Sequence, residues 1–368
     1  MLAYIIRRLL LIIPTLLGIM VINFAVIQFA PGGPVEVVIA RFQGTAVDAT
    51  ARISGQGGEL QQSGREDRQQ SGGSGSRYRG AQGIDPEIIK EIERQFGFDK
   101  PPLERFFLMM GKFLTFDFGS SFFRDRTVVE LILDKMPVSI SIGLWTTLIT
   151  YLICIPLGIR KAVQDGSRFD NWTTGVIVAA YAIPSFLFAV LLIVVFAGGS
   201  YWQIFPLRGL TSDGAENWPL AQRVADYLWH ITLPVTAMLI SSFTTLTLLT
   251  KNSFLDEIRK QYVMTARAKG LSEPRVLYGH VFRNAMLIVI AGFPGLFISV
   301  FFGSSLLIET IFSLDGLGQL GYRSAVERDY PVVFGTLFAF GLLGLVMGIL
   351  SDLMYAWVDP RIDFESRG

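Results

Sequence analysis

The sequence predicts an all-α, polytopic membrane protein, and three observations support that fold class. Of its 368 residues, 51% are hydrophobic and only 17% are charged, whereas soluble domains average about 25% charged residues. Six runs are mostly apolar for about 20 residues, the length that a helix needs to cross a bilayer. Several runs contain proline, which membrane helices tolerate because neighbouring helices satisfy the freed backbone groups. We therefore expect six transmembrane helices within a lipid bilayer.

The six predicted helices comprise residues 9–30, 138–159, 172–197, 231–249, 285–308 and 332–357. The first follows Arg7 and Arg8 and exceeds the 7–15 apolar residues of a typical secretory signal core, so we interpret it as an uncleaved helix. The fifth contains Pro294, and two shorter pieces broken at that proline are the alternative to one span.

Lysine and arginine residues predict the orientation of these helices. They concentrate before the first helix, after the second, fourth and sixth, and above all within residues 250–284. The segments 198–230 and 309–331 contain only two each. Because short cytoplasmic loops carry the excess of basic residues, both termini and residues 250–284 are expected in the cytoplasm. Residues 31–137 are then an extracytoplasmic insert.

This insert divides into two parts by composition. Residues 43–83 are rich in Gly, Ser, Gln and Arg and nearly lack apolar residues after Leu60, so we predict a disordered linker. Residues 84–123 are expected to form a helical cap. Asp85-Pro86 is a typical helix start, one apolar face follows, and a second amphipathic helix is expected over residues 103–114. The predicted apolar face of the first helix consists of Ile88, Ile89, Ile92 and Phe96.

Several kinds of chemistry are absent from the sequence. No G-x-x-x-x-G-K-[ST] or G-x-S-x-G motif occurs. One cysteine, Cys154, and two histidines do not favour a metal site. The net charge of +1 gives no reason to expect nucleic acid. Glu309 lies near the end of a predicted span; either its carboxylate reaches water, or it is a gate or pathway group.

Residues 250–284 predict a helix, a sharp turn and a second helix. Ser253 with Asp256 is a capping box for a helix that ends near residue 269. Gly270 suits the left-handed position after a helix, and Ser272 precedes the next helix. We expect Phe254, Ile258, Tyr262 and Ala266 to share one face. Such a thin helix end suits docking into a groove of another protein, and a basic loop at lipid headgroups is the alternative.

The segment resembles the cytoplasmic coupling loop of ATP-binding-cassette import permeases, whose pattern is E-A-A, three residues and Gly. Met264-Thr265-Ala266 stand at the E-A-A position and Gly270 is the glycine. The glutamate is absent, which fits the dipeptide and oligopeptide branch, in which "YVMTARAKGL" and "HVFRNA" are typical forms. Further matching stretches are "YIIRRLLLIIPTLLGI", "FAPGGP", "FGSSF", "ETIFSLDGLG", "RDYPVV" and "DPRI". "FPLRGL" and the long insert are similar to the Yej-type oligopeptide and microcin C importers.

The resemblance implies a type I importer permease of the bacterial inner membrane, with one transmembrane domain over residues 1–368. The implied partners are a second homologous permease, ATPase subunits that bind ATP and Mg²⁺, a periplasmic peptide-binding protein and a peptide. The chain itself would be neither an enzyme nor a cofactor-binding protein. The implied coupling residues are Tyr262, Met264, Thr265, Ala266, Arg267, Ala268, Lys269 and Gly270. We expect Glu87, Glu91 and Arg94 to face the binding protein.

Two other classes stay open. A secondary transporter or channel for small solutes would need no ATPase and would move solute in liposomes without one. A membrane-embedded enzyme would show hydrolytic activity in the purified chain, although the motifs for it are missing.

Overall fold

A computed structural model describes residues 2–29, 33–42, 86–95, 98–199, 201–302 and 305–358. Within these ranges the regular secondary structure is helical, apart from one isolated antiparallel bridge between Ser120 and Thr127. The all-α prediction is therefore confirmed. The chain divides into two compact units, one of residues 1–12, 134–320 and 342–368 and the other of residues 13–133 and 321–341.

The smaller unit contains the short helices of the insert. Its helices are the main part of α1 (Leu2–Phe29), α2 (Pro34–Phe42), α4 (Pro86–Gln95), α5 (Pro102–Leu114), the first residues of α6 (Val128–Val163), and parts of α14 (Leu317–Glu327) and α15 (Tyr330–Val358). Its core is aromatic: the ring of Phe113 meets Phe118 and Phe338 edge-on, with centroids 4.9 and 5.6 Å apart. These contacts fix α5 and the FGSS stretch against α15.

The larger unit is built around α9 (Leu220–Ile258). Its other complete helices are α7 (Arg168–Tyr181), α8 (Ser185–Phe196), η1 (Ala215–Asn217), α10 (Gln261–Ala268), α11 (Glu273–Val276), η2 (Leu277–Val281), α12 (Phe282–Phe302) and α13 (Ser305–Ile311). It also contains the rest of α1, α6, α14 and α15. α9 packs on α7, α8 and α12. At Gly158 of α6 a Cβ would lie 2.6 Å from the Thr250 Cβ of α9. Only glycine permits this close approach of the two helices.

Four predicted spans are confirmed by long apolar helices. Ile6–Gln28, Val128–Val163, Leu220–Ile258 and Tyr330–Met354 each have the length and hydropathy to cross a membrane. The third predicted span, residues 172–197, is not one straight helix, because α7 and α8 meet at 90°. Pro184 stands at the start of α8 with extended backbone (φ −57°, ψ 133°), and proline disfavours a helical residue before it. Counting this bent pair as one span gives five among the described residues.

The fifth predicted span corresponds to α12 followed by α13, with residues 303–304 outside the described part. α12 continues as a helix through Pro294, so the alternative of two pieces broken at that proline is wrong. A proline within a membrane helix is consistent with this continuity.

The two predicted helices of the insert are confirmed as α4 and α5. Ile92 is buried, and Ile89 packs with it against Val35 and Ile39 of α2, a helix that sequence analysis did not predict. Ile88, which was predicted on the same apolar face, is 48% exposed. Phe96 and the predicted disordered linker, residues 43–83, lie outside the described residues.

Candidate functional site

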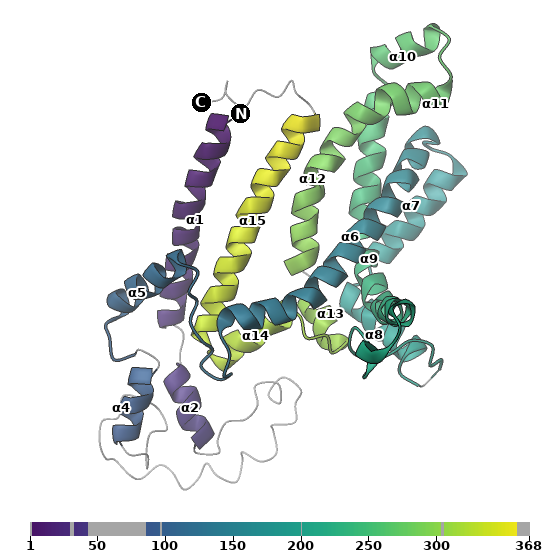
Figure 1. Cartoon of the computed structure of the whole chain (residues 1–368). Coiled ribbons are helices and arrows are strands. Elements are labelled where there is room, and N and C mark those ends of the chain that lie inside the picture. The colour runs from purple at the N-terminus through teal and green to yellow at the C-terminus, as the bar shows by residue number, and fades with distance from the viewer. Residues whose placement is uncertain are drawn as a thin grey trace, which may run out of the picture. The chain divides into compact units, whose positions relative to one another are not determined.

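The 250–284 segment lies at one end of α9 and α12, where α10 and α11 extend beyond the longer helices (Figure 1). The predicted helix start at Ser253 is wrong. Ser253 lies inside α9, which continues to Ile258, and its hydroxyl donates to the Ala285 carbonyl of α12. No residue between 250 and 258 interrupts helical hydrogen bonding, so the break comes at Lys260, whose backbone is extended (φ −75°, ψ 152°).

The turn after α10 is confirmed as a left-handed glycine turn. Gly270 has φ +81°. Its amide donates to the Arg267 carbonyl (2.9 Å), and the Leu271 amide donates to the Ala266 carbonyl (3.4 Å). This pair of bonds is the Schellman arrangement, which satisfies carbonyls at a helix end. Ser272 then precedes α11 as predicted, with Pro274 in its first turn.

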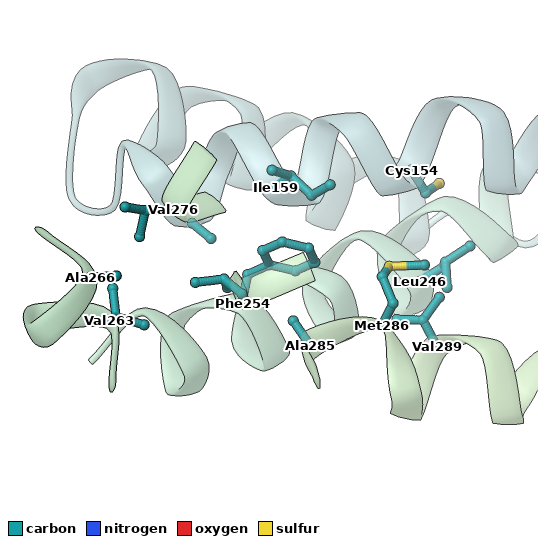
Figure 2. Packing of buried hydrophobic residues seen from close by; sticks show 12 residues of the cluster. Cys154, Ile159, Leu246, Phe254, Val263, Ala266, Val276, Ala285, Met286 and Val289 are labelled. Carbon is teal, nitrogen blue, oxygen red and sulfur yellow. The ribbon is translucent and has the colours of Figure 1, made fainter. Parts of the chain in front are cut away.

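α10 has one face in the core and one in solvent. Val263 is fully buried and Ala266 is 6% exposed, both within a cluster that includes Phe254, Val276 and Ile159 (Figure 2). Ala266 is therefore small because it packs against the chain's own core. The opposite face presents Met264, which is 64% exposed. Also exposed are Thr265, Arg267, Ala268, Lys269 and Gly270.

Two polar contacts hold α10 in place. The Tyr262 phenol donates to Glu257 Oε2 of α9 (2.8 Å) and accepts from Asn284 Nδ2 of α12 (3.3 Å). Burial raises the pKa of Tyr262; the Asn284 bond opposes this rise and the Glu257 carboxylate adds to it. The phenol therefore stays protonated and able to donate at neutral pH. Arg267 binds Glu273 of α11 through two nitrogens, at 2.8 and 3.1 Å.

Between α11 and α12 the helix widens into the π-helical turn η2. Such turns often occur at functional positions of helices. Val281 is buried in it, whereas Tyr278 and His280 are exposed. The helix that enters the fifth span thus starts with an irregular turn, which sequence analysis did not predict.

Sequence analysis also missed a cluster of buried charges beside this segment. Lys161 of α6 is fully buried, and its ammonium lies 2.9 Å from Asp170 Oδ1 of α7. It also donates to the Asp170 carbonyl and to the hydroxyls of Thr173 and Thr174. Lys251 of α9 binds Asp170 Oδ2 at 2.7 Å. These contacts join α6, α7 and α9 at one place.

The outer edge of the charge cluster reaches residues at the start of the 250–284 segment. Asp165, in the turn between α6 and α7, lies 3.0 Å from Lys251 Nζ and 3.5 Å from Arg259 Nη2. Arg259 is the C-cap residue of α9, and Lys260 alone separates it from α10. The sequence did offer one signal for the place of Asp170, the motif Ser167-x-x-Asp170. In the structure the Ser167 Oγ accepts a hydrogen bond from the Asp170 amide and caps α7.

Glu309 does not reach water, so the first of the two alternatives for its carboxylate is wrong. Its side chain is fully buried. Oε1 accepts from Ser139 Oγ (2.9 Å) and Oε2 accepts from the Gln319 amide (2.8 Å), while Ser139 Oγ accepts the Leu317 amide. The carboxylate therefore binds the N-terminal turn of α14, where a helix favours negative charge. A gating role for it stays a prediction.

In the smaller unit, two stretches that carried the family resemblance contact each other. Asp329 is buried, and its carboxylate accepts the Phe122 amide (3.0 Å) and the Ser121 hydroxyl. Arg124 binds Glu327 Oε2 at 3.0 Å. The "FGSSF" and "RDYPVV" stretches thus form one structural element. Glu87, Glu91 and Arg94 are exposed on α4, a position that leaves their predicted contact with a binding protein open.

Comparison with known proteins places the chain in a family. Residues 154–364 match the family described as "Binding-protein-dependent transport system inner membrane component". The chain is 65% identical to the peptidoglycan transport system permease protein YejB of Agrobacterium fabrum, over 99% of each chain. It is 59% identical to the inner membrane ABC transporter permease protein YejB of Escherichia coli O157:H7, over 99% of this chain and 100% of that one.

A more distant relative is similar over the same length. The oligopeptide transport system permease protein AppB of Bacillus subtilis is 32% identical over 99% of this chain and 100% of its own. The fold and these matches define a membrane-embedded transport subunit with several spans. The chain belongs to the family of inner membrane components of binding-protein-dependent transport systems, the ABC transporter permeases.

Proposed function

We propose that this chain is one permease subunit of an ATP-driven importer of peptides or peptide-containing molecules in a bacterial inner membrane. A second homologous permease would complete the pathway. Two ATPase domains would bind ATP and Mg²⁺ on the cytoplasmic side, and a periplasmic binding protein would deliver the substrate. In this arrangement the chain catalyses no reaction, binds no cofactor and has six spans with both termini in the cytoplasm.

The observation that carries the proposal is the construction of α10. It is a short helix whose exposed face includes Met264 and Arg267, and whose other face contributes Val263 and Ala266 to a hydrophobic cluster shared with α6, α9, α11 and α12. Tyr262 adds polar contacts to α9 and α12. A force on the exposed face would therefore pass into two long helices. This is the arrangement that a helix docked to an ATPase requires.

Alternating access then follows from differential binding. ATP shifts the population of inward-open and outward-open states only to the extent that the ATPase pair binds the two permease states with different affinity. α10 is the contact through which that difference reaches the spans. The buried cluster of Lys161, Asp170 and Lys251 would make α6, α7 and α9 respond together.

Purification of the chain from its own membrane tests the proposal. The expected result is a complex with a second permease and an ATPase. In proteoliposomes the complex should take up peptide only with ATP and a loaded binding protein. Uptake by the purified chain in liposomes without an ATPase would instead support a secondary transporter or channel.

A further inference from the structure

A hollow of about 590 Å³ lies beside the first turns of α9 in the larger unit. Its lining residues are Trp218, Gln222, Ala225, Asp226 and Trp229. The last four follow the i, i+3, i+4, i+7 spacing of a single helix face, and Trp218 precedes that face by one turn. The hollow therefore presents two indole rings and one carboxylate from neighbouring positions.

One wall of the hollow is held firmly. The Trp229 indole stacks on Phe205, with ring centroids 4.5 Å apart and planes 28° apart. Its Nε1 donates to the Ile204 carbonyl at 3.0 Å. Trp229 is nevertheless 47% exposed and Trp218 is 41% exposed. Both rings thus keep a large part of their surface available.

The carboxylate is held in a fixed orientation, and its side chain is 10% exposed. Asp226 Oδ2 accepts the Ser212 amide and Oδ1 accepts the Ser212 hydroxyl, each at 2.7 Å. His230 Nδ1 lies 3.4 Å from Oδ1 and 2.8 Å from the Asp226 carbonyl oxygen. A carboxylate accepts about four hydrogen bonds. The two donors of Ser212 therefore leave accepting capacity on both oxygens.

We propose that this hollow binds the amino end of an incoming peptide. An ammonium group suits a carboxylate as its ion partner and the faces of tryptophan rings as cation–π partners. The volume accommodates the first residues of a peptide as well as the ammonium itself. The assignment rests on the proposed function, because the predicted orientation places residues 198–230 on the side from which substrate arrives.

Photo-cross-linking of the whole transport complex in nanodiscs, without binding protein, tests this site. The probe is the tripeptide Ala-Ala-benzoylphenylalanine, compared with its N-acetylated form. The free amine should cross-link within residues 198–230, identified by mass spectrometry, about 2- to 30-fold more than the acetylated form. Trp218→Ala should abolish this preference, and Trp218→Phe should retain it. Trp172→Ala is the control, because Trp172 is 73% exposed on α7, outside the hollow.

Two further results decide between possible occupants. Equal cross-linking of the free and acetylated peptides would overturn the site. Alternatively, the free-amine peptide is preferred in phosphatidylglycerol nanodiscs and loses that preference in phosphatidylethanolamine nanodiscs. That result would assign the hollow to a lipid amine and would equally overturn the peptide site. If either occurs while ATP-driven peptide uptake is intact, this inference fails and the proposed function stands. Absence of any peptide uptake would count against the proposed function itself.

Discussion

Two sets of charged side chains meet at the same end of α9, and they differ in exposure. In α10 and α11, the side chains of Arg267 and Glu273 are 43% and 70% exposed. In the neighbouring cluster, those of Lys161 and Asp170 are 0% and 3% exposed. Exposed pairs contribute about 0–1 kcal/mol. Loss of one partner of a buried pair costs several times more. The exposed pair of Arg267 and Glu273 is therefore accessible to another protein, whereas the buried pair of Lys161 and Asp170 holds helices together.

The largest effect is expected from breaking the buried cluster. Asp170→Asn leaves Lys161 and Lys251 without the carboxylate that they share, and should destabilise the chain by about 3–5 kcal/mol. The measurement is the midpoint of thermal unfolding and the yield of assembled complex. Asp165→Asn is the matched control, because Asp165 is 39% exposed. Equal unfolding midpoints for both variants would show that the cluster does not hold the helices.

The second effect concerns the turn after α10. Gly270→Ala forces a residue with a Cβ into a left-handed conformation, at a cost of roughly 1–2 kcal/mol. No atom lies within 4 Å of that Cβ, so the strain is in the backbone alone. We expect ATP hydrolysis to continue while peptide uptake per ATP falls. Gly279→Ala is the control: Gly279 also has open space around its Cβ, and its φ is not positive. Equal uptake by the two variants would contradict a role for the turn.

The predictability of these features from sequence depends on how local their causes are. Gly270 and the start of α4 at Pro86 follow from helix capping, which involves residues close in sequence. The start of α10 was mistaken because Ser253 fits a capping pattern, yet its hydroxyl bonds Ala285 across a helix interface. Lys161 was counted only as a cytoplasmic charge, and nothing near it in sequence indicates that Lys251 shares its partner. Glu309 was misjudged for the same reason, since Ser139 lies far away in sequence.

A smaller effect is expected at the exposed helix α4. Combined reversal of Glu91→Lys and Arg94→Glu should reduce uptake when binding protein is limiting, and leave basal ATP hydrolysis unchanged. Both side chains are exposed, so the defect should depend on ionic strength, as interactions of solvent-exposed charges do. Uptake equal to wild type at every binding-protein and salt concentration would mean that α4 only covers the outer ends of the spans.

The smallest effect is expected for the exposed ion pair between α10 and α11. Arg267→Gln removes both bonds to Glu273, and should change the free energy of unfolding by less than about 1 kcal/mol. The unfolding midpoint, compared with that of Asp170→Asn, measures the contrast between the two sets of charges. A destabilisation as large as that of Asp170→Asn would mean that exposure does not separate them.

The most direct test is the number of peptides taken up per ATP hydrolysed in proteoliposomes containing the complex with Met264→Lys. Met264 is 64% exposed on the outward face of α10, so a charge there should not disturb the core. If this face transmits the ATPase movement, the variant should have a normal unfolding midpoint and a marked fall in uptake per ATP, and the conservative variant Met264→Leu should have a normal ratio of uptake to hydrolysis. Normal uptake per ATP in the Met264→Lys complex would contradict the claim that this face transmits the ATPase movement.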